Sequence, residues 1–343
     1  MCSNLMGILL TICIHLTMYG NTVEDPFTNN LPQRGVNLYL TEYDVHASEH
    51  FEKDVQRFLD RMEAAGINSI SLTWPIYTTS STSNYVYAGD DSLTSDSVIQ
   101  FTRIARARGF GVWMHPLLDE RILLQEGPRQ WRGNIRPKNT GVWFMSYMNL
   151  ISEYAKAAEF SGANGFMIAT ELWSMEPYHE EWEMLIENIR GNFSGILTYA
   201  SNRSIHDSVF PWSKVDVIGI NYFPNIQLSS NASVEQIIQW IKNDIDRILS
   251  GLDELGMDVI ITETGVTSQY NALRVTGRWN HRTRPDQETQ RRFYEAICSV
   301  WAENSSGIYW WNTVLHPIPE DMIDVDEYFN PFGKTAEEHV SCR

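Results

Sequence analysis

The sequence predicts a single α/β domain folded as a (β/α)8 TIM barrel, and three observations support this. The chain has 343 residues, 43% hydrophobic and 20% charged, so it can bury one large core. A single barrel of typical size would use nearly all of these residues. From Arg34 onward, short apolar runs alternate with longer segments of helical period, as in βα units around a parallel sheet. Glycines repeatedly stand where a helix would end before a strand.

Eight segments have the length and apolar content of buried strands. They are Gly35–Leu40, Ile67–Thr73, Phe110–His115, Gly165–Ala169, Gly195–Ala200, Val215–Asn221, Asp258–Glu263 and Gly307–Trp311. Periodicity alone does not separate a closed barrel from an open doubly wound sheet. The chain lacks a Gly-x-Gly-x-x-Gly after the first strand, a Gly-x-x-x-x-Gly-Lys-Ser/Thr loop and a His-Glu-x-x-His helix, so nucleotide binding and zinc hydrolysis have no support.

Two intervening segments show a clear helical face. The first carries Phe51, Val55, Phe58, Leu59 and Met62. The second carries Val234, Ile237, Ile238, Ile241, Ile245, Ile248 and Leu252, and a capping box of Ser233 and Gln236 precedes it. The glycines expected to end helices in a left-handed conformation are Gly66, Gly109, Gly162 and Gly256.

Residues 1–20 have the composition of a secretion signal. They contain no Asp, Glu, Lys or Arg, and the apolar run from Leu5 to Leu16 matches the roughly 7 to 15 residues of a signal-peptide core. A membrane anchor is the alternative, but a spanning helix needs about 20 apolar residues and His15 interrupts this run. We therefore predict a signal peptide over residues 1–20, a catalytic domain over residues 21–343, and a secreted, extracellular protein without stable membrane insertion.

Cysteines and glycosylation sequons agree with the secretory route. Loss of the signal would leave Cys298 and Cys342, an even pair that predicts one disulfide in an oxidising compartment, with two free thiols as the alternative. Asn-x-Ser/Thr sequons occur at Asn192, Asn202, Asn231 and Asn304. A glycan on Asn202, just past the fifth strand, would obstruct the barrel mouth, so this sequon should be unused if Asn202 lines the site.

The net charge of -17 makes phosphate backbones and anionic lipid surfaces poor partners, so we expect no nucleic-acid binding. Neutral or cationic substrates are favoured.

Two predicted strands end in a glutamate after apolar residues. Glu171 follows Ile168-Ala169-Thr170 on the fourth strand, and Glu263 follows Ile260-Ile261-Thr262 on the seventh. The carboxyl ends of barrel strands share one pocket, so both carboxyls should face the same cleft. Glycoside hydrolysis needs such a pair, whereas a salt bridge or backbone amides would explain either residue alone.

Several motifs, in order, resemble glycoside hydrolase family 113, the β-mannanases of clan A. They cover nearly the whole mature chain: Trp131 to Ile135, Ile168 to Trp173, Leu197 to Ala200, Asp216 to Pro224, Ile261 to Ser268, Gly307 to Trp311 and Asn330 to Ala336. The broad clan usually has Asn before the acid/base residue, but Thr170 stands here, as in family 113.

The resemblance implies a retaining hydrolase of β-1,4-mannan or manno-oligosaccharides that needs no metal or organic cofactor. Glu263 would be the nucleophile and Glu171 the acid/base, with carboxyls roughly 5 to 5.5 Å apart. A separation beyond about 6.5 Å would indicate inversion. We expect Glu171 to hold the proton while Glu263 is ionised.

Further residues are predicted to bind the sugar. By resemblance, Trp311 lies under the sugar and Tyr222 donates a hydrogen bond to the nucleophile, although Tyr222 is equally expected as an aromatic of the barrel wall. Whether Asn221 or Tyr222 faces the sugar stays open. His115 is predicted as a sugar contact or a buried strut, and Asp119 and Arg132 could simply pair with each other. Aromatic side chains suit sugar stacking, and the loop candidates are Trp74, Trp131, Trp143, Trp173 and Trp279.

Two other functions stay open. One is a retaining hydrolase of another neutral β-glycan, such as a glucan or galactan, because loop contacts select between sugar epimers. The other is an inactive, sugar-binding homologue. The presence of both glutamates argues against it.

Overall fold

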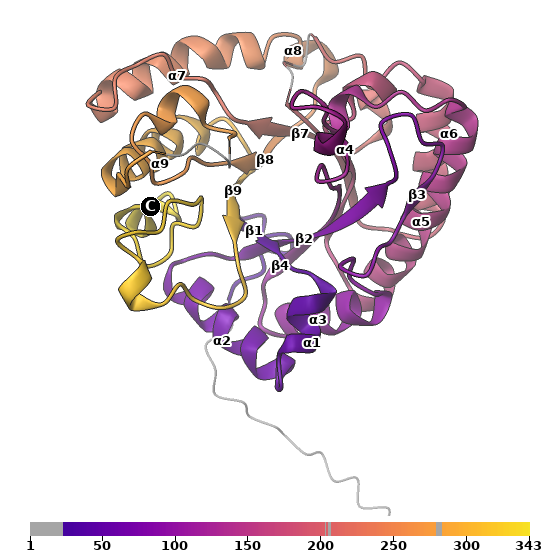
Figure 1. The fold of residues 1–343 in the computed structure, drawn as a ribbon, viewed down its shortest axis with the longest axis horizontal. Helices are drawn as coiled ribbons and strands as arrows, with labels where there is room; N and C mark the ends of the chain where they lie inside the picture. Colours follow the sequence, from indigo (N-terminus) through magenta and orange to yellow (C-terminus); the bar gives the residue numbers. More distant parts are fainter. Residues whose placement is uncertain (1–22, 203, 205–206, 279–282) are drawn as a thin grey trace, which may run out of the picture.

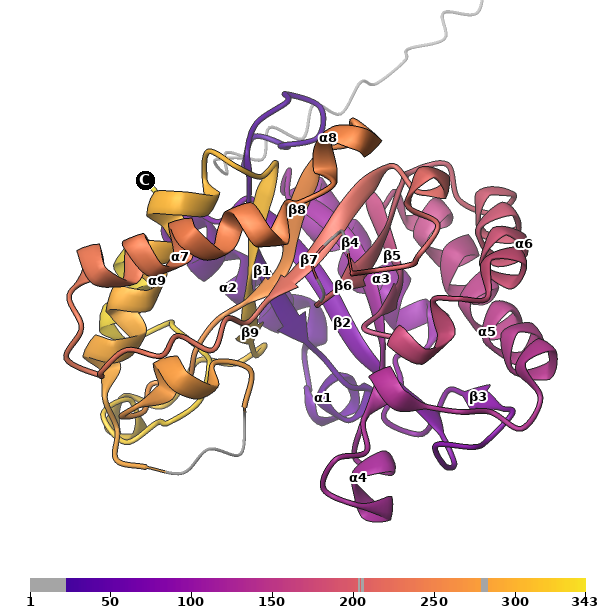
Figure 2. The ribbon, with the colours of Figure 1, turned by 90° about the horizontal axis from the view of Figure 1, so that it is seen from above.

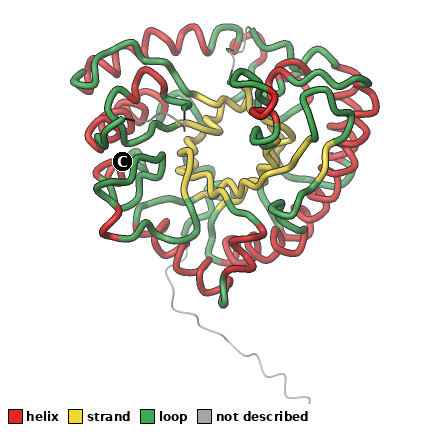
Figure 3. The backbone as a smooth tube through the Cα atoms, in the orientation of Figure 1, coloured by secondary structure: helices red, strands yellow, loops and turns green. Residues whose placement is uncertain are grey.

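The computed structural model describes residues 23–202, 204, 207–278 and 283–343, and the predicted signal peptide lies outside them. Eight parallel strands form the centre of the molecule and helices surround them (Figures 1 and 3). These strands are β1 (Gln33–Tyr39), β2 (Ser69–Thr78), β4 (Gly111–Leu118), β5 (Gly165–Thr170), β6 (Ile196–Ser201), β7 (Val217–Tyr222), β8 (Val259–Thr264) and β9 (Gly307–Thr313).

Pairing of β1 with both β2 and β9 closes the sheet. The predicted fold class is confirmed, and each predicted strand overlaps an observed one. A short strand, β3 (Val86–Tyr87), was not predicted; it pairs antiparallel with the far end of β2 and has only two residues, too few for a periodic pattern.

Nine α-helices are described, mostly in the outer layer (Figure 3). They are α1 (Glu42–Ala47), α2 (Phe51–Ala64), α3 (Ser95–Ala107), α4 (Leu123–Glu126), α5 (Thr140–Ser161), α6 (His179–Arg190), α7 (Val234–Ile248), α8 (Leu252–Leu255) and α9 (Gln287–Trp301). The short helices α1 and α4 and strand β3 lie at one end of the barrel, and α8 lies at the other (Figure 2). The first three follow strand carboxyl ends, so that end is the mouth where the predicted site should lie.

The predicted helical faces are the buried ones. All five apolar residues predicted for α2 are buried. In α7, the capping box of Ser233 and Gln236 is formed and Ile237, Ile241, Ile245 and Ile248 are buried, whereas Leu252 belongs to the separate helix α8. Gly109 (φ 87°) and Gly162 (φ 76°) lie after α3 and α5 in the left-handed conformation, where a Cβ would be strained.

A disulfide between Cys298 and Cys342 links α9 to the chain end, with the two Cα atoms 4.9 Å apart. Trp310 of β9 stacks on Tyr294 of α9 and donates from Nε1 to the carbonyl of Val340 at 2.8 Å. The C-terminal segment is thus fixed to the outer layer beside β9. None of the helices in the described ranges combines the length and apolar character that a membrane span requires.

Candidate active site

Glu171 lies directly after β5, in a backbone conformation that aims it at the barrel mouth. Its φ is +56°, in the left-handed region that non-glycine residues rarely adopt, and its amide donates to the carbonyl of Ala200 on β6 at 2.8 Å. Backbone strain of this kind persists where surrounding structure enforces it, and it clusters at functional sites. The residue is 7% exposed.

Two neighbours donate hydrogen bonds to the carboxylate of Glu171, one to each oxygen. Arg132, which begins the 3-10 helix η1 (Arg132–Asn134), donates from Nη1 to Oε2 at 2.9 Å. Asn221 of β7 donates from Nδ2 to Oε1 at 3.1 Å, and its own Oδ1 accepts from Thr262 of β8 at 2.8 Å. The β4 loop, β5, β7 and β8 therefore converge on one acidic group.

Glu263 lies on β8 in register with Asn221 of β7, so both side chains point to the same face of the sheet. It is 5% exposed. Among the described residues its Oε1 has no hydrogen-bond partner, and Nε2 of His115 lies 3.6 Å from it. A buried carboxyl oxygen left without a donor is costly for stability and is available to a substrate.

Burial and the negative charge of Glu171 raise the pKa of Glu263 well above its usual value, against the opposing effects of Arg132 and Asn221. The expectation that Glu171 holds the proton while Glu263 is ionised stays a prediction. Arg132 forms an ion pair directly with Glu171.

His115 of β4 is a support for the site rather than a sugar contact, which corrects the predicted substrate-binding role. Its side chain is 0% exposed, and Nε2 lies 2.7 Å from the hydroxyl of Thr170. Its Nδ1 lies 3.2 Å from Thr73 and 3.3 Å from Asn37. Burial, followed by the charge of Arg132, lowers its pKa to about 3, so the imidazole is neutral at physiological pH.

Because folding lowers the pKa of His115, the free energy of unfolding should decrease as the pH falls. Its pKa in the folded protein is about 3 against 6.5 in an unfolded chain, so its contribution is complete above pH 6.5 and is lost as the pH falls toward 3. Between pH 7 and pH 5 this one group should cost about 2 kcal/mol in the free energy of unfolding. Denaturant unfolding of wild type and His115→Gln at both pH values measures the difference.

Exposed His46 on α1 supplies the matched control, because His46→Gln should keep the wild-type pH dependence. An equal loss of stability in wild type and His115→Gln would show that His115 does not carry this effect. NMR of the histidine rings as a function of pH provides a second measurement. The His115 ring should stay neutral down to about pH 4.

The structure resolves which residue of β7 faces the mouth. A register shift after Ile220 pairs Asn221 with Glu263 and Tyr222 with Thr264. Because side chains alternate along a strand, Tyr222 then points outward, where its hydroxyl donates to Asp244 of α7 at 3.1 Å and its ring packs on Trp301 of α9. The predicted hydrogen bond from Tyr222 to the nucleophile is therefore wrong, and Tyr222 belongs to the barrel wall.

Trp311, near the end of β9, keeps part of its surface accessible and meets Tyr39 of β1 edge to face, with ring centroids 6.5 Å apart. The Tyr39 hydroxyl donates to Asp119, which also accepts from Arg121. An aromatic face beside hydroxyl and carboxylate groups suits a sugar ring. The predicted pairing of Asp119 with Arg132 is wrong, since Arg132 bonds to Glu171 and to Glu120 instead.

Trp131 and Trp173 form a second aromatic group at the mouth. Their rings meet edge to face with centroids 4.8 Å apart, and Trp173, in the 3-10 helix η2 (Trp173–Met175), donates from Nε1 to Oδ1 of Asn202. Both keep part of their surface accessible. Trp74 of β2 and Trp143 of α5 are buried in the core, so their predicted place in loops is wrong. The residue type alone does not separate a buried tryptophan from one in a loop. Trp279 lies outside the described residues.

Sequence reasoning missed the role of Arg132 and the buried polar support formed by Asn37, Thr170 and Thr262. Polar residues within apolar strand segments were the available signal, since buried polar groups need partners.

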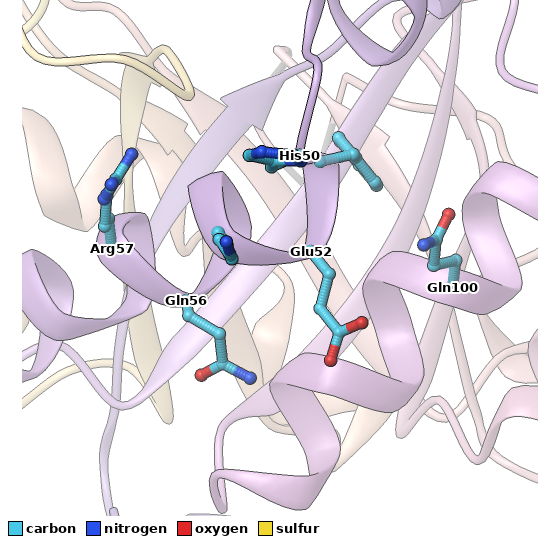
Figure 4. Close-up of a pocket in the computed structure, with 7 residues that line it drawn as sticks. His50, Glu52, Gln56, Arg57 and Gln100 are labelled. Carbon is cyan, nitrogen blue, oxygen red and sulfur yellow. The ribbon is translucent and has the colours of Figure 1, made fainter.

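One surface hollow lies elsewhere, lined by the first turns of α2 and by Gln100 of α3 (Figure 4). It lies in the outer helical layer and contains neither glutamate of the pair. The described residues include no cluster of three or more His, Cys, Asp or Glu side chains placed to hold a metal ion.

Comparison with known proteins gives a family match. The model described as Glycoside Hydrolase Family 113 matches residues 42–334. No curated protein sequence matches the chain significantly.

Solved structures agree in fold at low identity. A GH113 β-1,4-mannanase complex is 18% identical with a TM-score of 0.76, covering 91% of this chain and 98% of that one. The GH113 β-mannanase AaManA from Alicyclobacillus acidocaldarius, in complex with ManMIm, is 19% identical with a TM-score of 0.74, covering 91% and 96%. A GH5_18 enzyme variant from Streptomyces cattleya, in complex with Manβ1-4GlcNAc, is 12% identical with a TM-score of 0.59, covering 90% and 79%.

Proposed function

Because the chain belongs to glycoside hydrolase family 113, we propose that it hydrolyses β-1,4-mannan or manno-oligosaccharides with retention of configuration. The observation that carries this proposal is the meeting of Glu171 and Glu263 at one barrel mouth, each buried and each close to Asn221. The two GH113 β-mannanase structures described above share the fold and support the choice of sugar.

In the proposed first step a carboxylate oxygen of Glu263 attacks the anomeric carbon while the bond to the leaving oxygen breaks. Glu171 gives its proton to that oxygen, and a glycosyl ester on Glu263 remains. Water then attacks the same carbon, Glu171 accepts its proton and the ester bond to Glu263 breaks. Two inversions restore the original anomeric configuration.

Neighbouring groups have distinct roles in these two reaction steps. Asn221 orients Glu171 by its hydrogen bond, and the hydroxyl of Thr262 fixes the Asn221 amide. Neutral His115 fills the space beneath the pair without bringing a positive charge to the nucleophile. Trp311 offers an apolar face for one sugar ring.

A slow fluorinated mannosyl substrate tests nucleophile, stereochemistry and sugar together. The intact protein should gain the mass of one mannosyl group, and peptide mapping should locate it on Glu263. No adduct, together with an inverted product by NMR, would overturn the retaining mechanism. Reducing ends released from β-glucan but not from β-mannan would instead favour a hydrolase of another neutral glycan.

We also propose that residues 1–20 direct secretion and that Asn192, Asn231 and Asn304 are glycosylated. Asn231 and Asn304 are exposed and Asn192 is partly exposed. Asn202 should stay unmodified, because its side chain bonds to Trp173 at the mouth. Mass spectrometry of the secreted protein before and after glycosidase treatment checks all four positions.

A further inference from the structure

Arg132 contacts two carboxylates at once. Its Nη1 lies 2.9 Å from Oε2 of Glu171 and 3.2 Å from Oε1 of Glu120. Its Nε donates to the carbonyl of Leu118, at the end of β4, at 2.8 Å, which fixes the plane of the guanidinium. All three charged side chains are largely buried, with 14% exposure for Arg132, 23% for Glu120 and 9% for Glu171.

Among the described residues, negative charge exceeds positive charge around this contact. Three carboxyls, those of Glu120, Glu171 and Glu263, act on the single guanidinium of Arg132. Other groups facing them from the described elements are His115 of β4, which is neutral, Asp119 beside Glu120, and Tyr199 of β6. Burial raises the pKa of Glu120 and Arg132 opposes this, with Glu171 raising it further.

This arrangement poses a problem for an acid catalyst. A full positive charge bonded to Glu171 alone would stabilise its carboxylate and weaken it as a proton donor to the leaving oxygen. A second carboxylate on the same guanidinium neutralises that charge. The contact then still orients Glu171 through a hydrogen bond.

We propose that Glu120 is a positioning residue that shares the guanidinium of Arg132 with Glu171 and thereby keeps the acid/base carboxyl able to hold its proton. The inference rests on the proposed function, in which Glu171 protonates the leaving oxygen. Glu120 touches no reacting atom and acts through Arg132.

The test compares two leaving groups in Glu120→Gln, a substitution that removes charge and keeps size. Mannopentaose needs a proton on its departing oxygen, whereas 2,4-dinitrophenyl β-mannoside does not. The alkaline limb of kcat/KM for mannopentaose should move to lower pH by about one unit, with about a tenfold loss above it. Turnover of the dinitrophenyl substrate should change less than about twofold.

Two further variants strengthen the test. Glu120→Asp, which keeps the charge, should restore most of the wild-type pH profile. Arg132→Gln removes the cation and should move the alkaline limb to higher pH, so the proposal stays testable if Glu120→Gln folds poorly.

Glu288→Gln is the matched control. Glu288 pairs with Arg291 on α9 in the outer layer, so this variant should hydrolyse both substrates at wild-type rates.

Equal losses on both substrates with an unshifted pH profile would overturn the proposal and assign Glu120 a merely structural role. Failure of the proposed function looks different. In that case Glu171→Ala itself would show no dependence on the leaving group.

Discussion

Glu263→Gln should lower kcat on manno-oligosaccharides by at least about 10⁴-fold while the protein stays folded. The neutral amide cannot attack the anomeric carbon, so no glycosyl ester forms. Because burial and Glu171 raise the pKa of Glu263, the acid limb of the wild-type profile should lie above the ordinary glutamate value of 4.5. Steady-state kinetics across pH, with melting curves on the same samples, measure both effects.

The same substitution should stabilise the protein at neutral pH. The pKa of Glu263 is raised on folding, so the stability this group contributes is complete below 4.5 and is lost as the pH rises through the folded value. Removing the buried charge should increase the free energy of unfolding at pH 7 by about 1 to 3 kcal/mol, with little change at pH 4.

Glu288→Gln again serves as the control, with unchanged activity and no such gain. A Glu263→Gln enzyme that retains more than about a tenth of wild-type kcat would refute the assignment of the nucleophile. A variant that is less stable at pH 7 would instead show that the carboxylate is well satisfied in the folded protein.

Glu171→Ala should produce a loss that depends on the leaving group. Hydrolysis of manno-oligosaccharides should fall about 10² to 10⁴-fold, because the departing oxygen receives no proton. Formation of the glycosyl ester from dinitrophenyl β-mannoside should be nearly retained, since that leaving group needs no acid. Burst kinetics on the aryl substrate and steady-state rates on oligosaccharides separate the two.

Added azide should rescue the second step of this variant. A small anion can enter the space left by the carboxylate and attack the glycosyl ester without base assistance, giving β-mannosyl azide. An α-configured azide, or rates on both substrates that fall equally, would contradict a retaining acid/base role for Glu171. Glu187→Ala, on the exposed face of α6, provides the matched control and should leave all these rates unchanged.

Local patterns in the sequence account for most of the barrel. Every predicted strand overlaps an observed one because a buried parallel strand is a short apolar run, and the intervening helices show their own period. Prediction was weakest where an element is too short to have a period, as in β3, or where an apolar tryptophan could belong to core or loop, as with Trp74.

The site residues, likewise, were only partly predictable from the sequence. Glu171 and Glu263 were visible because a glutamate ending an apolar strand is unusual and because parallel strands share a carboxyl end. The sequence left open whether Asn221 or Tyr222 faces the mouth. A one-residue register shift between β7 and β8 decides which side chain points inward, and no local sequence pattern records that shift.

The sequence by itself determined the order of βα units and the two strand ends that carry the acids, because those features depend on neighbouring residues alone. Only the tertiary structure decided that Asn221 faces the mouth, that His115 is a buried neutral support and that Arg132 joins Glu171 to Glu120. These contacts join residues distant in the chain. They are set by barrel closure and strand register, which fix distance and direction between elements that local spacing leaves open.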